Sequence, residues 1–551
     1  MSLSSDTIEV YDSTLRDGAQ AQGITYSVDD KLLIARKLDW LGVHYLEGGW
    51  PNRTNPGDME FFVRARKETW KNAKIAAFGS TRRAGAAAAD DANLRNILEA
   101  ETEVATIFGK TWDLHVRDVL KCDLDENLRL IEDSVAWLRR HDRRVIYDAE
   151  HFFDGYRASP DYALRTLRAA EEGGAEMVVF CDTNGGTLVA DVQRIIGEAI
   201  PHLHVPFGMH AHNDGGMAVA NTIVAVEAGA RQVQGVVNGF GERCGNANLC
   251  TIIPTLELKL GKTAIGRERL RRLTEASRFV AEVANLMHDH RQPYVGESAF
   301  AHKGGAHIDA MMKNPQCYEH IDPAEVGNER QFLISQQAGT STIVHKLEGI
   351  LPGVDKRDPR VVSLLEKVKQ LEFQGYAFEA ADASFELLAL RELGMYTDPF
   401  EVLAWRTINR YGDGGETGRT ESEAIVKLRV RGEVRHTVSD GHGPVDALSQ
   451  ALRRALLTDF PSLGVVRLED YKVRDLSSGA GTAASVRVLI ESADHVTGET
   501  WGTVGVSENI LEASWQALID SMCYKLMRDD RAARAEDAQP RSANSAATAT
   551  T

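Results

Sequence analysis

The chain has 551 residues, which is too long for one ordinary domain and predicts two or three. Its formal net charge of −17 argues against nucleic acid as the main partner, because phosphate binding needs a basic surface. No signal peptide or membrane-spanning segment is expected, since no apolar run is long enough. The six cysteines form no CxxC pair and favour a reduced, cytoplasmic compartment.

The first half of the chain repeats one pattern, in which a short apolar run ends in a polar or glycine-rich turn and an amphipathic stretch follows. Amphipathic stretches such as Asp29–Leu41 and Glu126–His141 have helical periodicity. Eight such alternations predict a parallel (β/α)8 TIM barrel of the α/β class. The predicted strands are Ile8–Asp12, His44–Gly48, Lys74–Gly79, Val104–Phe108, Arg144–Asp148, Met177–Cys181, Val205–His210 and Gln232–Val237.

The second half changes character, so we divide the chain into four parts. A catalytic barrel is predicted over 1–265 and a helical linker region over 266–395. Over 396–530, the β-like runs alternate with helices such as Pro444–Leu457, which predicts a separate α+β domain. These runs are Glu423–Val430, Ala484–Glu491 and Thr500–Val506. Residues 531–551 are rich in Ala, Ser and Thr without apolar periodicity, so we expect a disordered tail there.

The carboxyl ends of the predicted strands carry a concentration of polar residues, and barrel enzymes build their sites at that rim. His210 and His212 are two residues apart in a strand, so both imidazoles point to the same side. Asp17 can add an anionic oxygen and Asn246 a neutral one. This mixed set predicts a divalent metal ion, Mg²⁺, Mn²⁺ or Zn²⁺, used as a Lewis acid. A hydrogen-bonded histidine pair in a packed barrel is the alternative.

Other rim residues are candidates for binding and proton transfer. Arg16 can hold a carboxylate and stabilise a growing oxyanion, or form a plain ion pair. Gln20 lies on the same loop as Asp17. Glu150 and Glu47 can each act in the site or serve only as a counter-ion. The Thr183 hydroxyl can donate a hydrogen bond to a substrate carboxylate.

A segment beyond the predicted barrel, Ala299–His307, combines two histidines and a lysine with glycines. Such a segment can fold over the mouth of a barrel, and a histidine is the natural general base near neutral pH. A loop that ties two domains together would have the same composition. The residues alone leave both interpretations open.

Three motifs in order give the chain a family resemblance: Asp12–Gln20, His210–Asp214 and Gly241–Asn246. Together they resemble the isopropylmalate synthase, homocitrate synthase and citramalate synthase family of metal-dependent barrel enzymes. The resemblance covers about residues 6–528. Further segments are similar to the citramalate synthase branch, namely Leu46–Pro51, Phe108–Val116, Asp148–Tyr156 and Phe300–His307.

The resemblance implies roles for individual residues. Asp17, His210, His212 and Asn246 would surround the metal, and Arg16 would stabilise the developing negative charge. Thr183 would hold the carboxylate of a 2-oxoacid, and Arg16 and Gln20 would also bind the substrate. Glu150, His307 and Tyr318 would serve proton transfer at the methyl group of acetyl-CoA. Ser13 stands where the family commonly has threonine.

The resemblance also implies an activity and its regulation. The expected reaction is a Claisen-type condensation of acetyl-CoA with pyruvate, as the first step of a threonine-independent route to isoleucine. The α+β domain would be allosteric, with isoleucine as a possible effector, and the chain would form a homodimer.

Three other functions stay open at this point. An isopropylmalate synthase would use 2-oxoisovalerate and serve leucine synthesis. A lyase or carboxyl transferase could use the same barrel, although those enzymes lack this last domain. An amino-acid sensor on an inactive barrel would need no complete set of rim residues.

Overall fold

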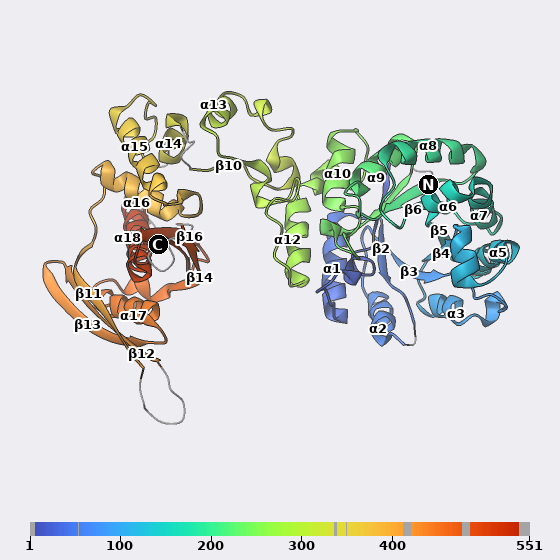
Figure 1. Cartoon of the computed structure of the whole chain (residues 1–551), viewed down its shortest axis with the longest axis horizontal. Helices are drawn as coiled ribbons and strands as arrows, with labels where there is room; N and C mark the ends of the chain where they lie inside the picture. Colours follow the sequence, from blue (N-terminus) through green and yellow to red (C-terminus); the bar gives the residue numbers. More distant parts are fainter. Residues whose placement is uncertain are drawn as a thin grey trace, which may run out of the picture. The chain divides into compact units, whose positions relative to one another are not determined.

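The computed structural model describes residues 6–52, 54–334, 339–348, 350–411, 420–476 and 485–538. The chain divides into two compact units, which we treat separately. The barrel unit comprises Met1–Ala301 and Glu319–Gln331, and the second unit comprises His302–Tyr318 and Phe332–Thr551. Both units are labelled by element in Figure 1. Within the barrel unit, α12 (Leu273–Val283) packs on α1 (Val28–Leu41).

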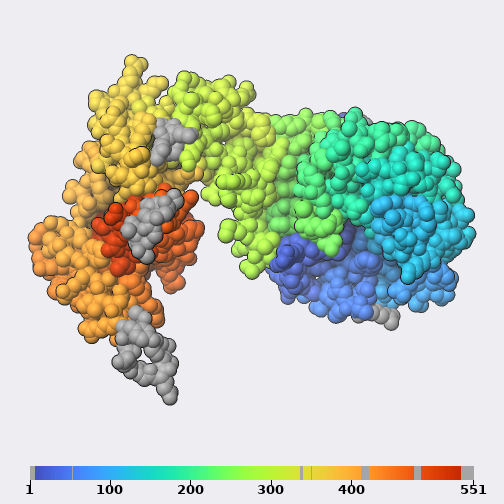
Figure 2. All heavy atoms as spheres, viewed as in Figure 1, coloured from blue at the N-terminus to red at the C-terminus, as the bar shows by residue number. Residues whose placement is uncertain are grey.

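The barrel unit is built on a closed sheet of eight parallel strands in sequence order, which confirms the predicted fold class. Closure comes from pairing of the first strand with the last, where Tyr11 stands opposite Gln234. In Figure 2 the blue N-terminal segment accordingly adjoins the green segment of the same unit. The strands are β1 (Glu9–Asp12), β2 (Tyr45–Gly49), β3 (Lys74–Ser80), β4 (Val104–Lys110), β5 (Arg144–Glu150), β6 (Met177–Asp182), β7 (Phe207–Ala211) and β8 (Gln232–Gly235).

Helices surround this sheet, as Figure 1 illustrates. Ser27 begins α1 with a complete capping box to Asp30, which satisfies backbone donors at the helix start. Pro160 takes the first position of α7, whereas Ser159 before it makes no capping bond. The other helices are α2 (Pro56–Ala65), α3 (Ala92–Glu99), α4 (Asp113–His115), α5 (Leu124–Arg140), α6 (Phe152–Ala158), α7 (Pro160–Glu172), α8 (Val189–Ala199), α9 (Ala218–Glu227), α10 (Leu249–Leu258) and α11 (Arg267–Leu270).

The inside of the barrel is layered because alternate residues of each strand point inward. Apolar side chains such as Tyr11, Ile146 and Val179 form one buried cluster there. Toward the carboxyl ends of the strands the inward positions turn polar, with Glu47, Asp148 and other charged groups fully or almost fully buried. Burying such groups is costly unless each has a partner, so this layer marks the functional end of the barrel.

The second unit contains helices followed by two antiparallel sheets of three strands, ordered β11-β12-β13 and β14-β15-β16. Helix α17 packs on the first sheet and α18 on the second. These elements confirm the α+β class. Their bounds are α13 (Gly305–Lys313), α14 (Thr340–Leu347), α15 (Pro359–Phe373), α16 (Asp382–Glu392), β11 (Phe400–Tyr411), β12 (Thr420–Val430), β13 (Glu433–Gly441), α17 (Pro444–Leu456), β14 (Val466–Asp475), β15 (Val486–Asp494), β16 (Thr500–Ser507) and α18 (Ile510–Ala538); the short strands β9 (Ala301–His302) and β10 (Gln331–Phe332) lie where the chain passes between units.

The last helix differs from the prediction. Regular structure was expected to end at residue 530, but α18 continues to Ala538. Residues 531–538 are alanines and charged residues with high helix propensity, which explains the continuation. The rest of the predicted tail, 539–551, lies outside the described residues. Among the described residues, no helix is long and apolar enough to cross a membrane.

Candidate active site

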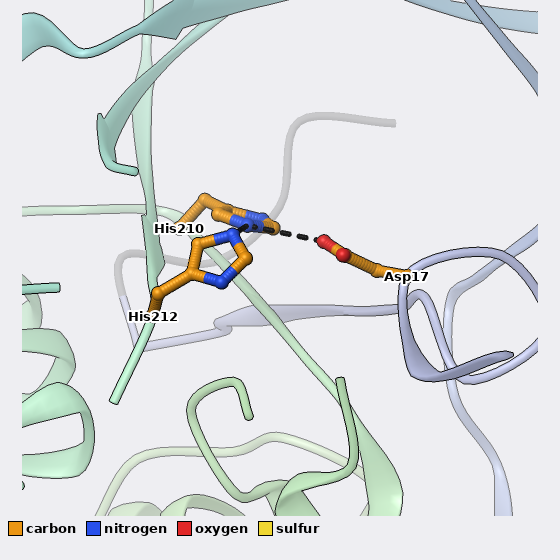
Figure 3. A group of neighbouring side chains, drawn as sticks. All are labelled: Asp17, His210 and His212. Carbon is orange, nitrogen blue, oxygen red and sulfur yellow. Dashed lines mark hydrogen bonds and ion pairs between the residues drawn. The ribbon is translucent and has the colours of Figure 1, made fainter. Parts of the chain in front are cut away.

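Three predicted metal ligands meet at the rim of the barrel. Asp17 follows β1, His210 lies on β7, and His212 comes directly after that strand. All three are buried, and Figure 3 displays their side chains pointing toward one another. His210 Nε2 lies 3.4 Å from Asp17 Oδ2 and 3.4 Å from His212 Nε2. Two donor atoms bound at about 2.1 Å to one ion are at most about 4.2 Å apart, so these spacings suit a shared cation.

The electrostatics of the cluster also fit a cation. Burial opposes ionisation of Asp17, but Arg16 and His210 hold its pKa well below the usual range. Burial first and His210 second lower the pKa of His212 to about 4, so this imidazole is neutral near pH 7. An ionised carboxylate beside a neutral imidazole is the form in which both groups bind metal. The buried Nδ1 atom of His212 has no hydrogen-bond partner among the described residues.

Asn246 reaches the cluster through a loop that folds back from β8. Its backbone pairs with His212, and its Nδ2 donates to Asp17 Oδ2 at 3.1 Å. Gly241 makes this fold possible, because its φ is +147° and an added Cβ would lie 2.0 Å from Asn246 Oδ1. The Asn246 amide therefore presents its nitrogen and not its oxygen to Asp17. Its role as a metal ligand stays a prediction.

Arg16 lies beside the proposed metal position and is held on three sides. Its guanidinium pairs with Glu47 and lies 3.4 Å from Asp17 Oδ2. It also stacks 3.8 Å from the centre of the Phe78 ring. Glu47 is itself fixed by the Tyr11 hydroxyl, which donates to it at 2.6 Å. Glu47 is thus the counter-ion of Arg16, and the guanidinium is rigidly placed at the rim.

A cavity of about 220 Å³ opens at this cluster. Glu150 lines it and pairs with Lys110. Thr183 lines it too, and its oxygen accepts a hydrogen bond from the backbone N–H of His151 at 2.9 Å, which leaves the hydroxyl proton for another acceptor. The predicted residues Arg16, Asp17, Gln20, Glu150, Thr183, His210 and His212 are therefore gathered around one cavity.

The remaining predicted residues, His307 and Tyr318, belong to the second unit. Their rings stack with centres 4.2 Å apart. The structure thus brings these two residues together, while their part in proton transfer stays a prediction. His307 lies in the first turn of α13, and Tyr318 is 49% exposed.

Some residues of the site were not singled out from the sequence. The aromatic rings of Trp50, Phe78 and Phe108 line the cavity and pack together with centres 5.5 to 5.6 Å apart. Gln234 contacts His210 from the next strand. Gln232 and Gln234 are two residues apart on β8 and point to the same buried face. Two amides on a buried strand face were the sequence signal that could have identified Gln234.

Three family descriptions match consecutive parts of the chain. Residues 7–280 match the family described as HMGL-like. Residues 294–375 match the homocitrate synthase post-HMGL domain-like family, and residues 379–526 match the LeuA allosteric (dimerisation) domain.

Curated relatives align over nearly the whole chain. The (R)-citramalate synthase of Geobacter sulfurreducens is 51% identical, over 95% of this chain and 98% of its own length. That of Aquifex aeolicus is 52% identical, over 95% of this chain and 99% of its own length. The probable 2-isopropylmalate synthase of Methanopyrus kandleri is more distant, at 32% identity over 93% of this chain and 97% of its own length.

Proposed function

Since the chain belongs to the family of (R)-citramalate synthases, we propose that it condenses acetyl-CoA with pyruvate and water to give (R)-citramalate and CoA. The product would feed a threonine-independent route to isoleucine. The observation that carries this proposal is the single cavity that holds Arg16, Thr183 and the Asp17, His210 and His212 cluster. A 2-oxoacid has a carboxylate and a ketone oxygen, and this cavity offers a partner for each.

Each residue of the cavity has a chemical task in this proposal. Asp17, His210 and His212 would hold a divalent ion, which polarises the ketone when bound. Thr183 donates its hydroxyl hydrogen to the substrate carboxylate. Arg16 stabilises the negative charge that grows on the ketone oxygen as the new C–C bond forms. That oxygen then takes a proton, and water cleaves the thioester to release CoA.

A second cavity offers room for the thioester end of an acyl-CoA. It measures about 470 Å³ and shares Arg16, Gln20 and Trp50 with the cavity at the metal cluster. A thioester bound there would place its acetyl group beside the acceptor. Such placement is essential, because the methyl C–H is weakly acidic and proximity must supply much of the rate.

The defining test is CoA release from acetyl-CoA with pyruvate, 2-oxoisovalerate and 2-oxobutyrate as alternative acceptors. We expect a strong preference for pyruvate, in the presence of Mg²⁺ or Mn²⁺, and loss of activity with a chelator. Preference for 2-oxoisovalerate would move the protein to leucine synthesis. Absence of release with every acceptor would support a lyase or a sensor on the same barrel.

The aromatic wall of Trp50, Phe78 and Phe108 supports pyruvate as the acceptor. In this proposal the acceptor side chain lies against these packed rings, which would accept a methyl group and oppose a branched side chain. The Phe108→Leu variant is expected to raise kcat/KM for 2-oxoisovalerate relative to pyruvate by about 10-fold or more, since one or two methylenes in a pocket are worth about 1–3 kcal/mol. Phe108 is chosen because Phe78 supports Arg16. An unchanged ratio would place the acceptor side chain elsewhere.

We also propose that His307, with Tyr318 and with Glu150, serves proton transfer at the acetyl methyl group. The family motif and the stacked His307 and Tyr318 rings support this role. The His307→Ala variant is expected to lower kcat by about 10²–10⁴-fold, as loss of a general base does. Exchange of the acetyl-CoA methyl protons with deuterated solvent should slow in parallel. Normal exchange would assign the base to another residue.

Assembly and regulation follow from the LeuA-type region at residues 379–526. We propose a homodimer formed through it, with isoleucine as feedback inhibitor. Sedimentation should give about twice the mass of one 60.6 kDa chain. Isoleucine should lower CoA release, while leucine at the same concentration should not. We further propose a cytoplasmic location, which the six free cysteines support.

A further inference from the structure

A line of buried polar contacts leads from the metal cluster into the barrel. The Nδ1 atom of His210 lies 3.0 Å from Gln234 Oε1, and Gln234 Nε2 lies 3.0 Å from Asp148 Oδ1. These three residues come from β7, β8 and β5, and none is more than 6% exposed. They form a chain of imidazole, carboxamide and carboxylate behind the face of His210 that looks toward Asp17.

The partners of Gln234 fix the direction of its amide. The Nε2 atom donates to Asp148 Oδ1 at 3.0 Å, and this contact fixes the amide; Gln232 Oε1 lies farther away, at 3.4 Å. In the structure the Gln234 nitrogen is the donor on that side, because the carboxylate of Asp148 accepts there and a carboxamide oxygen cannot donate. The Gln234 oxygen is therefore turned to His210 and can accept only from an Nδ1–H group. His210 thus carries a proton on Nδ1, which leaves Nε2, on the side of Asp17 and His212, as the nitrogen that can bind an ion.

We propose that Gln234 is a positioning residue for the metal centre: it holds His210 in the tautomer and orientation in which Nε2 binds the ion, and Asp148 holds Gln234. This inference rests on the metal binding proposed above. It deepens that proposal, because it assigns part of the metal affinity of the site to a residue that does not contact the ion. Loss of such an outer partner typically costs about 10–100-fold in metal affinity.

Plain packing does not account for Gln234. A carboxamide buried at 1% exposure costs free energy unless both of its ends are bonded, and a barrel interior is otherwise filled well by branched apolar residues. Gln232 is the internal comparison. It lies two residues earlier on the same face of β8 and is fully buried, but it contacts Glu9 and Gln234 instead of a metal ligand.

The test compares Gln234→Met with Gln232→Met in the full-length protein. Each change removes one buried carboxamide and keeps a side chain of similar length. Mn²⁺ affinity is measured by competition with a chelator, and thermal unfolding of the metal-free protein reports on the fold. We expect Gln234→Met to weaken Mn²⁺ binding about 10–100-fold. Gln232→Met should stay within about 3-fold of the parent.

The outcomes separate this inference from the metal site itself. If the parent protein binds no Mn²⁺, the proposed metal site fails. If the parent binds and Gln234→Met binds equally well, or if Gln232→Met is just as weakened, the positioning role fails. Should Gln234→Met not fold, ring-nitrogen NMR of the parent labelled with ¹⁵N-histidine still decides. The His210 signals, assigned by their loss in His210→Ala, must report a proton on Nδ1 in the metal-free protein, and an Nδ1 without a proton would overturn the inference.

Discussion

The His210→Ala variant is expected to lose bound divalent metal and CoA release together. His210 is the central one of the three proposed ligands, because its Nε2 atom lies 3.4 Å from both Asp17 Oδ2 and His212 Nε2. Without it, two ligand side chains remain and one imidazole is lost. The drop in Mn²⁺ affinity should exceed the roughly 10–100-fold that loss of an outer partner costs. Metal content after dialysis and CoA release with pyruvate are the two measurements.

The matched control for this variant is His204→Ala, which removes an imidazole that is 85% exposed and lies outside the cavity. It should keep both metal and activity. Retained turnover in His210→Ala at normal rate would contradict the metal site. Loss of turnover with full metal content would instead give His210 a role other than ligation. Thermal unfolding of the metal-free proteins must accompany both results, because His210 is buried in the barrel.

The barrel could be predicted from the sequence because strand-like and helix-like patterns of apolar residues alternate along it. Buried parallel strands read as short apolar runs, and the helices between them carry an apolar stripe. The eight predicted strands agree with β1 to β8 within two residues at each end. The histidine pair was equally accessible, because residues two apart in a strand point to one side wherever the strand lies in the fold.

Other parts of the site depend on strand pairing, which the sequence does not reveal. Gln234 meets His210 because β7 and β8 pair with these two residues in register. Phe78 and Phe108 come from β3 and β4, 30 residues apart in the chain, and Trp50 follows β2. Inward-facing residues near the ends of different strands gather only when the barrel closes. A prediction made from each strand end separately could not show that these residues lie in one site.

The second unit was harder to predict because its sheets are largely solvent-exposed. Strands β11, β13 and β14 were not identified. In β14, charged residues occupy many positions and most of the strand is exposed, so it lacks the apolar run on which the prediction depended. In β13, only one of the residues Glu433–Gly441 is buried. Strand β12 was found because the alternate residues Ala424, Val426, Leu428 and Val430 are apolar and buried.

The Arg16→Lys variant tests a step that the metal site alone cannot explain. Lysine keeps the positive charge beside Asp17, so bound metal should be retained. It lacks the planar fork that pairs with Glu47 and lies over Phe78, so the donors proposed to stabilise the growing oxyanion are lost. We expect kcat for CoA release with pyruvate to fall about 10²–10³-fold, the usual cost of removing one such donor.

Arg36→Lys provides the matched control, because Arg36 pairs with Glu68 at an exposed position, and its kcat should be unchanged. The readouts of His210→Ala and Arg16→Lys then separate metal binding from oxyanion stabilisation. His210→Ala should empty the metal site, whereas Arg16→Lys should slow a site that is still loaded. A loss of metal in Arg16→Lys would mean that Arg16 acts chiefly by holding Asp17 in its ionised form, since Arg16 lowers the pKa of that carboxyl. Full activity would remove Arg16 from oxyanion stabilisation and leave that charge to the metal alone.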